Sequence, residues 1–284
     1  MRHALVFGGT GQIGTRVLQQ LLANGWQVSA VSRDLQVNRE NLTWLRGDLQ
    51  QVEYLPARVD AIFSLGPLDH FSQWYADTSV VSPRVIAFGS TSLGTKQDSV
   101  DPYERDVAAR LQAAEVLIFD AARRRQAQAT VLRPTLVYGA GRDRTLTQIA
   151  SLARRTGFFL LPRDAKGLRQ PVHVQDLADA AVAVVDASAS HGHSYALPGG
   201  ETITYTEMVD RVLASLQPRA RLIRIPAPLF SAVLSAARAL GKMQGLGDAA
   251  VARMRDDLVF DVAPAQRDFG YSPRAFNPTD DMFK

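Results

Sequence analysis

A glycine-rich turn between two segments of different pattern constrains the fold of this chain more than any other feature. The turn follows a short apolar run at residues 4–7, and residues 15–24 after it carry apolar side chains at helical spacing. Residues 26–31 then have the pattern of a second buried strand. Strand, turn, helix and strand in this order predict a parallel βαβ unit, with the turn at the helix N-terminus. The turn consists of Gly8, Gly9, Thr10, Gly11, Gln12, Ile13 and Gly14.

The glycine spacing predicts a binding site for the pyrophosphate of a dinucleotide. Glycine supplies backbone angles closed to other residues, lets a phosphate approach the main chain, and allows the helix to pack closely on the strand. Two residues, rather than one, separate Gly8 from Gly11. A purely structural turn is the alternative interpretation.

The end of the second strand bears on which dinucleotide is bound. A carboxylate there would accept the ribose hydroxyls of NAD, but the strand ends in Ser32 and Arg33. A guanidinium beside a hydroxyl suits the 2′-phosphate of NADP, which is therefore the expected cofactor. Asp34 follows at once and keeps NAD open as the less favoured alternative.

Strand and helix patterns alternate through the first 140 residues, which predicts an α/β fold with a Rossmann-type, doubly wound parallel sheet. Residues 1–140 and about 170–194 are expected to form this NAD(P)-binding domain. The helical patterns in residues of about 141–169 and 195–284 predict a smaller, mostly helical C-terminal substrate lobe.

Composition excludes several classes of site. The chain of 284 residues has no cysteine, so it has no disulfide, thiolate nucleophile or thiolate metal site, and no metal is expected. A formal charge of +4 gives little reason to expect nucleic-acid binding. No apolar run approaches the ~20 residues of a membrane span, so we expect a cytoplasmic protein without a membrane partner.

Ordered segments along nearly the whole chain resemble the short-chain dehydrogenase/reductase superfamily, in particular its extended branch of nucleotide-sugar epimerase-like proteins. The resemblance implies that Asp48 and Leu49 contact adenine, and that Leu65 and Gly66 end a fourth strand beside the cofactor. It also implies a role near the nicotinamide for the loop after the segment that contains Arg133 and Pro134.

The same resemblance implies that Thr91 bonds the substrate carbonyl after the fifth strand, with Ser90 beside it. The resemblance ends at the family's catalytic pair, which is a tyrosine followed four residues later by a lysine. In that pair the ammonium lowers the pKa of the phenol, so that the tyrosine can transfer a proton. Aligned on Glu115, this chain has Val107 and Leu111 at the two positions. Neither can transfer a proton, as in atypical members of the superfamily.

Replacement groups are expected at the C-terminal edge of the sheet. Tyr138 and His70 are candidate catalytic residues, the alternatives being a packing tyrosine and an exposed histidine at a helix start. Arginines on segments that line the substrate cleft in relatives are candidates to bind an anionic substrate, or else are exposed loop residues: Arg142, Arg144 and Arg169.

Two functions remain open on the sequence. The first is an NADP-dependent oxidoreductase or epimerase-like enzyme, acting on a small carbonyl or hydroxyl compound, anionic or nucleotide-linked. The second is a non-catalytic NADP(H)-binding sensor or accessory subunit. We expect a monomer or a homodimer with a small-molecule substrate as its partner.

Overall fold

The computed structural model describes residues 1–143, 145–239 and 248–284. The chain divides into two compact units, each built from separate stretches of sequence. Unit 1 comprises Met1–Thr135, Val174–Leu197 and Asp261–Ser272, and unit 2 comprises Leu136–His173, Pro198–Phe260 and Pro273–Lys284. The segment Asp261–Ser272 therefore lies with the sheet, whereas the sequence analysis assigned it to the lobe.

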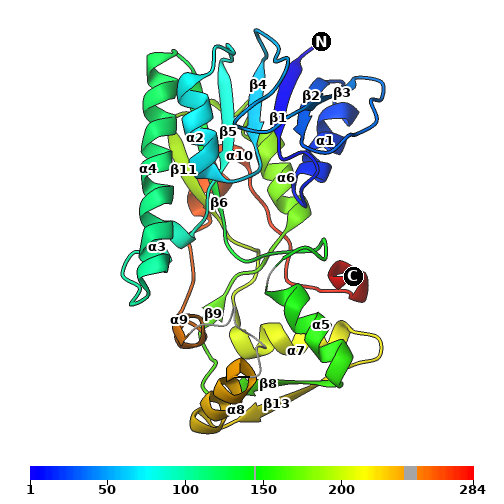
Figure 1. Cartoon of the computed structure of the whole chain (residues 1–284), viewed down its shortest axis with the longest axis vertical. Coiled ribbons are helices and arrows are strands. Elements are labelled where there is room, and N and C mark those ends of the chain that lie inside the picture. Colours follow the sequence, from blue (N-terminus) through cyan, green and yellow to red (C-terminus); the bar gives the residue numbers. More distant parts are fainter. Residues whose placement is uncertain (144, 240–247) are drawn as a thin grey trace. The chain divides into compact units, whose positions relative to one another are not determined.

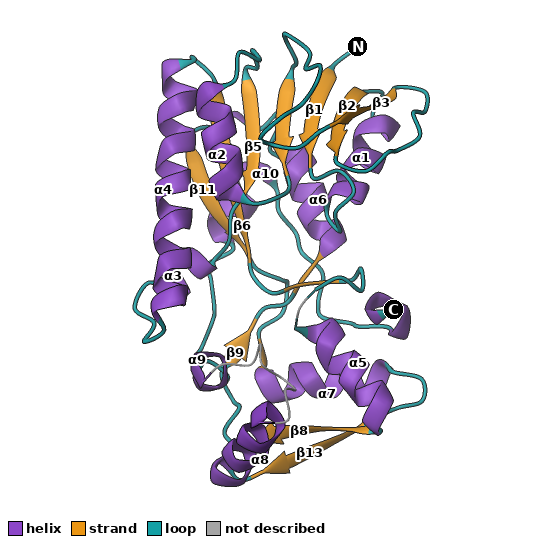
Figure 2. Ribbon diagram, viewed as in Figure 1, coloured by secondary structure: helices purple, strands orange, loops and turns teal. Residues whose placement is uncertain are grey.

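Unit 1 contains a seven-stranded, fully parallel sheet in the order β11-β6-β5-β4-β1-β2-β3 (Figures 1 and 2). The predicted Rossmann-type sheet is thus confirmed. Its strands are β1 (His3–Phe7), β2 (Gln27–Ser32), β3 (Leu42–Arg46), β4 (Ala61–Ser64), β5 (Arg84–Phe88), β6 (Gln128–Pro134) and β11 (His193–Leu197).

Helices cover both faces of this sheet. From β1 the chain moves one way to β2 and β3 and the other way to β4, β5 and β6, and right-handed crossovers in opposite directions place the helices on opposite faces. Helix α1 packs against α6, and α2 packs against α4. The helices are α1 (Gly14–Ala23), α2 (Leu68–Asp77), α3 (Ser92–Thr95), α4 (Pro102–Arg124), α6 (Val174–Ala183), the 3₁₀ turn η1 (Ser188–Ser190) and α10 (Ala263–Phe269).

The late segments join unit 1 through specific contacts. The Tyr195 hydroxyl on β11 donates to Asp268 Oδ2 over 2.6 Å, and its ring meets that of Phe269 edge-on. These contacts hold α10 against the sheet. Sequence patterns along α10 do not reveal a partner 73 residues away, which is why this segment was misplaced.

A buried arginine ties β5 to β6 and to the segment after α6. Arg84 is 5% exposed and donates to the carbonyls of Gln128, Val184 and Val185, and to the hydroxyls of Thr130 and Ser190. Burial lowers the pKa of Arg84 to about 10. The hydrogen bonds compensate the desolvation of the guanidinium.

Unit 2 contains both helices and short strands and has its own hydrophobic core. Buried side chains of α5 and α7 pack around Tyr138, Leu161 and Phe276. Strand β8 pairs in parallel with β13, β7 pairs with β10, and β9 pairs antiparallel with β12. Its elements are β7 (Val137–Tyr138), α5 (Leu146–Thr156), β8 (Phe158–Pro162), β9 (Leu168–Arg169), β10 (Val172–His173), β12 (Ile203–Thr204), α7 (Tyr205–Ser215), β13 (Arg221–Ile225), α8 (Ala227–Ala239), α9 (Asp248–Ala252) and the 3₁₀ turn η2 (Asp280–Phe283).

Candidate functional site

The glycine turn joins the C-terminal end of β1 to the first turn of α1. Gly8 has φ +79°, and a Cβ on it would lie 3.0 Å from the carbonyl carbon of Leu65 at the end of β4. A Cβ on Gly14 would lie 2.1 Å from the Gly8 oxygen, so the helix start lies against the turn. A Cβ on Gly11 would meet only the Gly8 oxygen within 4 Å, which leaves open the side that a pyrophosphate would approach.

Other groups around the turn fit a bound dinucleotide. Among the described residues, α1 has no side-chain cap and no acidic residue in its first turn, so neither of these groups compensates the positive end of its dipole. The buried Oε1 of Gln12 and the Oγ of Ser64 have no hydrogen-bond partner among the described residues. A ligand that donates hydrogen bonds would satisfy such atoms.

The ends of β2 and β3 supply charged groups beside the turn. Arg33 and Asp34 are exposed, whereas Ser32 is 7% exposed and its hydroxyl donates to the Asp34 carbonyl over 2.9 Å. Ser32 therefore shapes the turn that presents its two neighbours. Asp48 Oδ1 accepts from the backbone N–H groups of the two residues at 50 and 51, and these bonds lower the pKa of its carboxyl.

His70 lies on α2, which begins after Gly66. Its ring is exposed, and its charge and that of Arg33 both lower the pKa of Asp48 further. His70, Arg33 and Asp48 thus share one electrostatic neighbourhood at the edge of the sheet. Leu65 and Gly66 are half-buried, and the Leu65 N–H donates to the Phe7 carbonyl, which holds the β4 end beside the glycine turn. Leu49 is also half-buried and packs on the unit 1 core.

The residues after β5 are fixed to the end of β6. The Thr91 hydroxyl donates to the Pro134 carbonyl over 3.1 Å, and the Thr91 N–H donates to the same oxygen. The Ser90 hydroxyl accepts from the Ser92 N–H. Both hydroxyls follow the C-terminal end of β5; that of Ser90 serves a local turn, and that of Thr91 bonds to the end of β6.

Arg133 makes a bidentate ion pair with Glu115 of α4. Its Nε lies 2.7 Å from Oε1, its Nη2 contacts Oε2, and the Ser194 hydroxyl also donates to Oε2. The Glu115 side chain is 3% exposed and that of Arg133 is 30% exposed. This pair joins α4 to β6 and β11, a role that the sequence analysis did not foresee for Arg133.

Helix α4 carries apolar side chains where relatives place the tyrosine and lysine. Leu111 packs on the unit 1 core, and Val107 is half-buried one turn earlier. The first turn of the same helix holds a pair that the sequence analysis missed, namely buried Glu104 with Lys96. The rarity of lysine in this arginine-rich chain was the signal that could have drawn attention to Lys96.

The remaining candidates belong to unit 2. Tyr138 is 1% exposed and meets the rings of His173 and Phe276 edge-on, which favours the packing alternative. Arg169 is 7% exposed, donates to the carbonyls of Leu168, Asp256 and Arg253, and stacks over a tyrosine ring. Its guanidinium therefore joins β9 to the 253–257 segment. Arg142 is exposed, and Arg144 lies outside the described residues.

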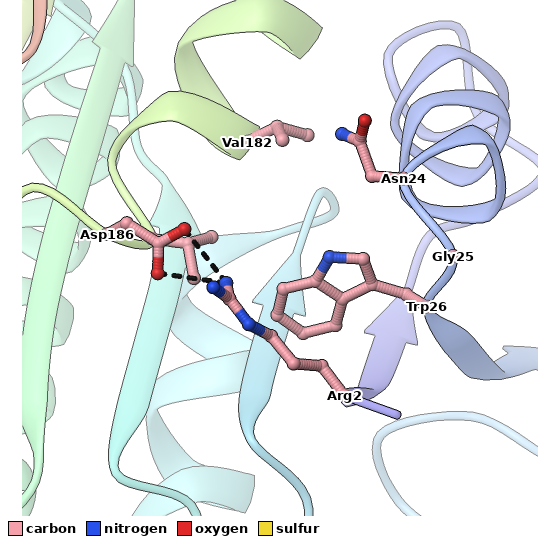
Figure 3. Close-up of a pocket in the computed structure, with 7 residues that line it drawn as sticks. Arg2, Asn24, Gly25, Trp26, Val182 and Asp186 are labelled. Carbon is pink, nitrogen blue, oxygen red and sulfur yellow. Dashed lines mark hydrogen bonds and ion pairs between the residues drawn. The ribbon is translucent and has the colours of Figure 1, made fainter.

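A pocket of about 240 Å³ lies at the opposite end of the strands, where β1 begins (Figure 3). Arg2 pairs with both oxygens of Asp186 and lies 5.1 Å from the Trp26 ring centroid. Ligands of open α/β sheets bind at the carboxyl ends of strands, so this pocket is separate from the dinucleotide site.

The described residues contain no group of three His, Cys, Asp or Glu side chains arranged to hold a metal ion. None of their helices combines the length and apolarity needed to cross a bilayer.

Comparison with known proteins agrees with this geometry. The sequence profile of the NAD dependent epimerase/dehydratase family matches residues 4–81 and 74–197, which carry the glycine turn and the central sheet. The chain belongs to this family. NAD(P) binding and an oxidoreductase- or epimerase-like activity are the general properties of such epimerase/dehydratase proteins, and the resemblance stated from the sequence is confirmed.

Individual relatives are distant. The family member described here is 27% identical over 258 residues to NADH dehydrogenase [ubiquinone] 1 alpha subcomplex subunit 9, mitochondrial, of Arabidopsis thaliana. That match covers 81% of this chain but 62% of the subunit's length. It is 25% identical to 2-alkyl-3-oxoalkanoate reductase of Stenotrophomonas maltophilia, over 95% of this chain and 94% of the reductase.

Solved structures share the fold. The epimerase Mth375 of Methanothermobacter thermautotrophicus superposes with a TM-score of 0.70 at 15% identity, over 97% of this chain and 88% of its own. MoeE5 in complex with UDP-glucose and NAD gives a TM-score of 0.69 at 20% identity, over 96% and 94%.

Proposed function

We propose that this epimerase/dehydratase family member is an NADP(H)-dependent oxidoreductase. The observation that carries the cofactor preference is the exposed guanidinium of Arg33 at the end of β2. It makes no ion pair with any residue that the structure describes, and it follows β2, which pairs in parallel with β1 just before the glycine turn. A dianionic 2′-phosphate would supply its missing partner.

Each group around the glycine turn has a defined role in the proposed dinucleotide site. The N-terminus of α1 and the open side of Gly11 hold the pyrophosphate, and Asp48 and Leu49 border the adenine. Leu65 and Gly66 border the nicotinamide half, with Arg133 and Pro134 behind Thr91. When bound, the nicotinamide supplies hydride to the substrate carbon.

Calorimetric titration with NADPH and NADH, on the wild type and on Arg33→Ala, tests the cofactor proposal. Loss of a charge-assisted contact costs about 1.5–3 kcal/mol, or ~10- to 150-fold in Kd for NADPH, with NADH unchanged. Arg39→Ala removes another exposed arginine of the same segment and is the matched control. Equal affinities for NADPH and NADH, lost in Asp34→Asn rather than Arg33→Ala, would favour NAD instead.

The substrate proposed is a small carbonyl compound with an anionic group. The similarity to a 2-alkyl-3-oxoalkanoate reductase supports a 3-oxo acid as the substrate. Oxidation of NADPH by 2-alkyl-3-oxoalkanoates, and reduction of NADP⁺ by UDP-glucose, whose sugar has hydroxyls but no free carbonyl, test this proposal. Reaction with the 3-oxo acids and not the nucleotide sugar is the expected result.

A second candidate function is a cofactor-binding accessory subunit without turnover. Apolar Val107 and Leu111 favour it, as does the similarity to a subunit of NADH dehydrogenase. Tight NADPH binding with no oxidation by any compound of the panel would select this candidate. A change in partner affinity between NADPH and NADP⁺ would then be its positive test.

A further inference from the structure

Helix α3 and the first turn of α4 hold a partly buried ion pair in unit 1. Lys96 follows α3, and its Nζ lies 3.4 Å from Glu104 Oε1. The two side chains are 24% and 9% exposed. The Ser99 hydroxyl donates to Glu104 Oε2 over 2.7 Å, so the carboxylate is oriented by two groups of the loop that follows β5.

Glu104 lies on the face of α4 that turns toward the sheet. Glu104, Ala108 and Glu115 are all buried on this face, and Leu111 between them packs on the core. Glu115 fixes the position of the face, since a Cβ on Gly89 at the end of β5 would lie 3.2 Å from its Oε1. The ion pair therefore lies beyond the end of β5, outward along α4 from Glu115.

The pair is close to the positions of the missing catalytic residues. Val107, at the tyrosine position, is three residues after Glu104, which is about 4.5 Å along a helix axis. The loop that carries Lys96 begins at Thr91, the candidate to bind the substrate carbonyl. A flexible lysine held at Glu104 can reach along this part of α4.

Lysine is chemically distinct from the other cations of this chain. Only four of its 32 cationic side chains are lysines, and Lys96 is the one in unit 1. Arginine does not give up its proton in proteins, whereas an ammonium can donate one and regain it. Of the two cations, only lysine can thus supply a proton to a developing alkoxide at this place.

We propose that Lys96 is the proton donor that replaces the missing tyrosine, with Glu104 as its positioning residue. This assignment rests on the proposed oxidoreductase function. As hydride forms the new C–H bond, the carbonyl π pair moves to oxygen, which takes a proton from the Lys96 ammonium. The resulting neutral amine regains a proton from water, which its partial exposure permits.

Protection from acylation tests the location of Lys96 without turnover. The full-length protein is treated with acetic anhydride, with and without NADPH at ten times its Kd, and modification is measured by mass spectrometry. Labelling of Lys96 with NADPH should fall to roughly a tenth of its value without NADPH, because roughly a tenth of the protein is then free of cofactor. Exposed Lys166 in unit 2 is the internal control. Unchanged Lys96 labelling with NADPH bound would overturn the assignment and leave the cofactor proposal standing.

Lys96→Arg separates proton donation from structure, because arginine keeps the charge facing Glu104. We expect kcat for reduction of the 3-oxo acid to fall on the order of 10²-fold or more, with NADPH affinity and melting temperature unchanged. Ethylammonium should restore turnover to Lys96→Ala, and tetramethylammonium, which has no N–H proton, should not. Lys166→Arg is the matched control.

Three further results would refute the assignment of Lys96. Retention of kcat in Lys96→Arg would show that the ion pair is structural. Loss of kcat in Lys96→Ala without rescue by ethylammonium would also exclude proton donation. No reduction of any panel compound by the wild type would remove the proposed enzyme function, and this inference with it.

Discussion

Replacing Gly14 by alanine should disrupt the glycine turn through one added methyl group. The new Cβ would lie 2.1 Å from the Gly8 oxygen and 2.8 Å from the Gly9 Cα, both backbone atoms that cannot rotate away. Either α1 must retreat from β1 or the turn must open. Gly94→Ala adds the same group where nothing lies within 4 Å, and its backbone has no positive φ.

The expected magnitude follows from these distances. Overpacking against rigid groups costs about 1–3 kcal/mol, and contact with three backbone atoms favours the upper end, about 3 kcal/mol. Alanine in a helix recovers about 1 kcal/mol relative to glycine, so Gly14→Ala should lose about 2 kcal/mol net. Gly94→Ala should change stability by less than about 1 kcal/mol in the favourable direction. Displacement of the first N–H groups of α1 in Gly14→Ala should weaken NADPH binding by at least about tenfold, or about 1.4 kcal/mol.

Urea unfolding followed by tryptophan fluorescence measures this loss in unit 1 alone, because Trp26, Trp44 and Trp74 all belong to that unit. Calorimetry measures the NADPH affinity of the same two variants. Equal unfolding midpoints for Gly14→Ala and Gly94→Ala would refute the close approach of α1 to the turn. A destabilised variant with wild-type NADPH affinity would refute the role of that helix start in binding.

Three further predictions concern single side chains. Glu115→Ala removes the carboxylate that pairs with the half-buried guanidinium of Arg133 and should lower the free energy of unfolding in urea by about 3 kcal/mol. Asp120→Ala, in an exposed pair, should lower it by about 0.5 kcal/mol, and equal losses would contradict this ranking. Hydrogen bonds lower the pKa of the Asp280 carboxyl below its usual 3.8, so its contribution to stability is present above pH 3.8 and is lost as the pH falls further. Asp280→Asn should therefore reduce the fall in melting temperature between pH 5 and pH 2, measured by circular dichroism. An unchanged fall would exclude Asp280 as its cause. Thr91→Val should cost about 1 kcal/mol in the same urea assay through its lost bond to the Pro134 carbonyl. Thr95→Val, at the last residue of the short helix that follows Thr91, is the control.

The sheet and the glycine turn were predictable because their signals are local. An apolar run, three spaced glycines and a helical pattern are contiguous in sequence, and β1 and α1 begin and end close to the predicted positions. The exposed position of Arg33 follows from the same reasoning, since it comes directly after a buried strand.

Other features could not be foreseen because they depend on distant partners. Arg169 was a candidate to bind an anionic substrate or else an exposed loop residue, but it is buried, and two of the carbonyls it binds lie more than 80 residues away along the chain. Glu115 served only to align the sequence, and its pairing with Arg133 and Ser194 depends on the order of strands in space. Lys96 and Glu104 are eight residues apart, at a distance where periodicity does not report contact.

The segmented construction of unit 1 has a consequence for its synthesis. When residues 1–135 have left the ribosome, β6 still lacks its neighbour β11, and its edge can pair with another chain. Arg84 at that stage also lacks three of its five acceptors, which arrive with residues 184–190. The nucleotide-binding half should thus mature only after the intervening part of unit 2 has been translated, and a fragment ending at residue 135 should aggregate rather than fold.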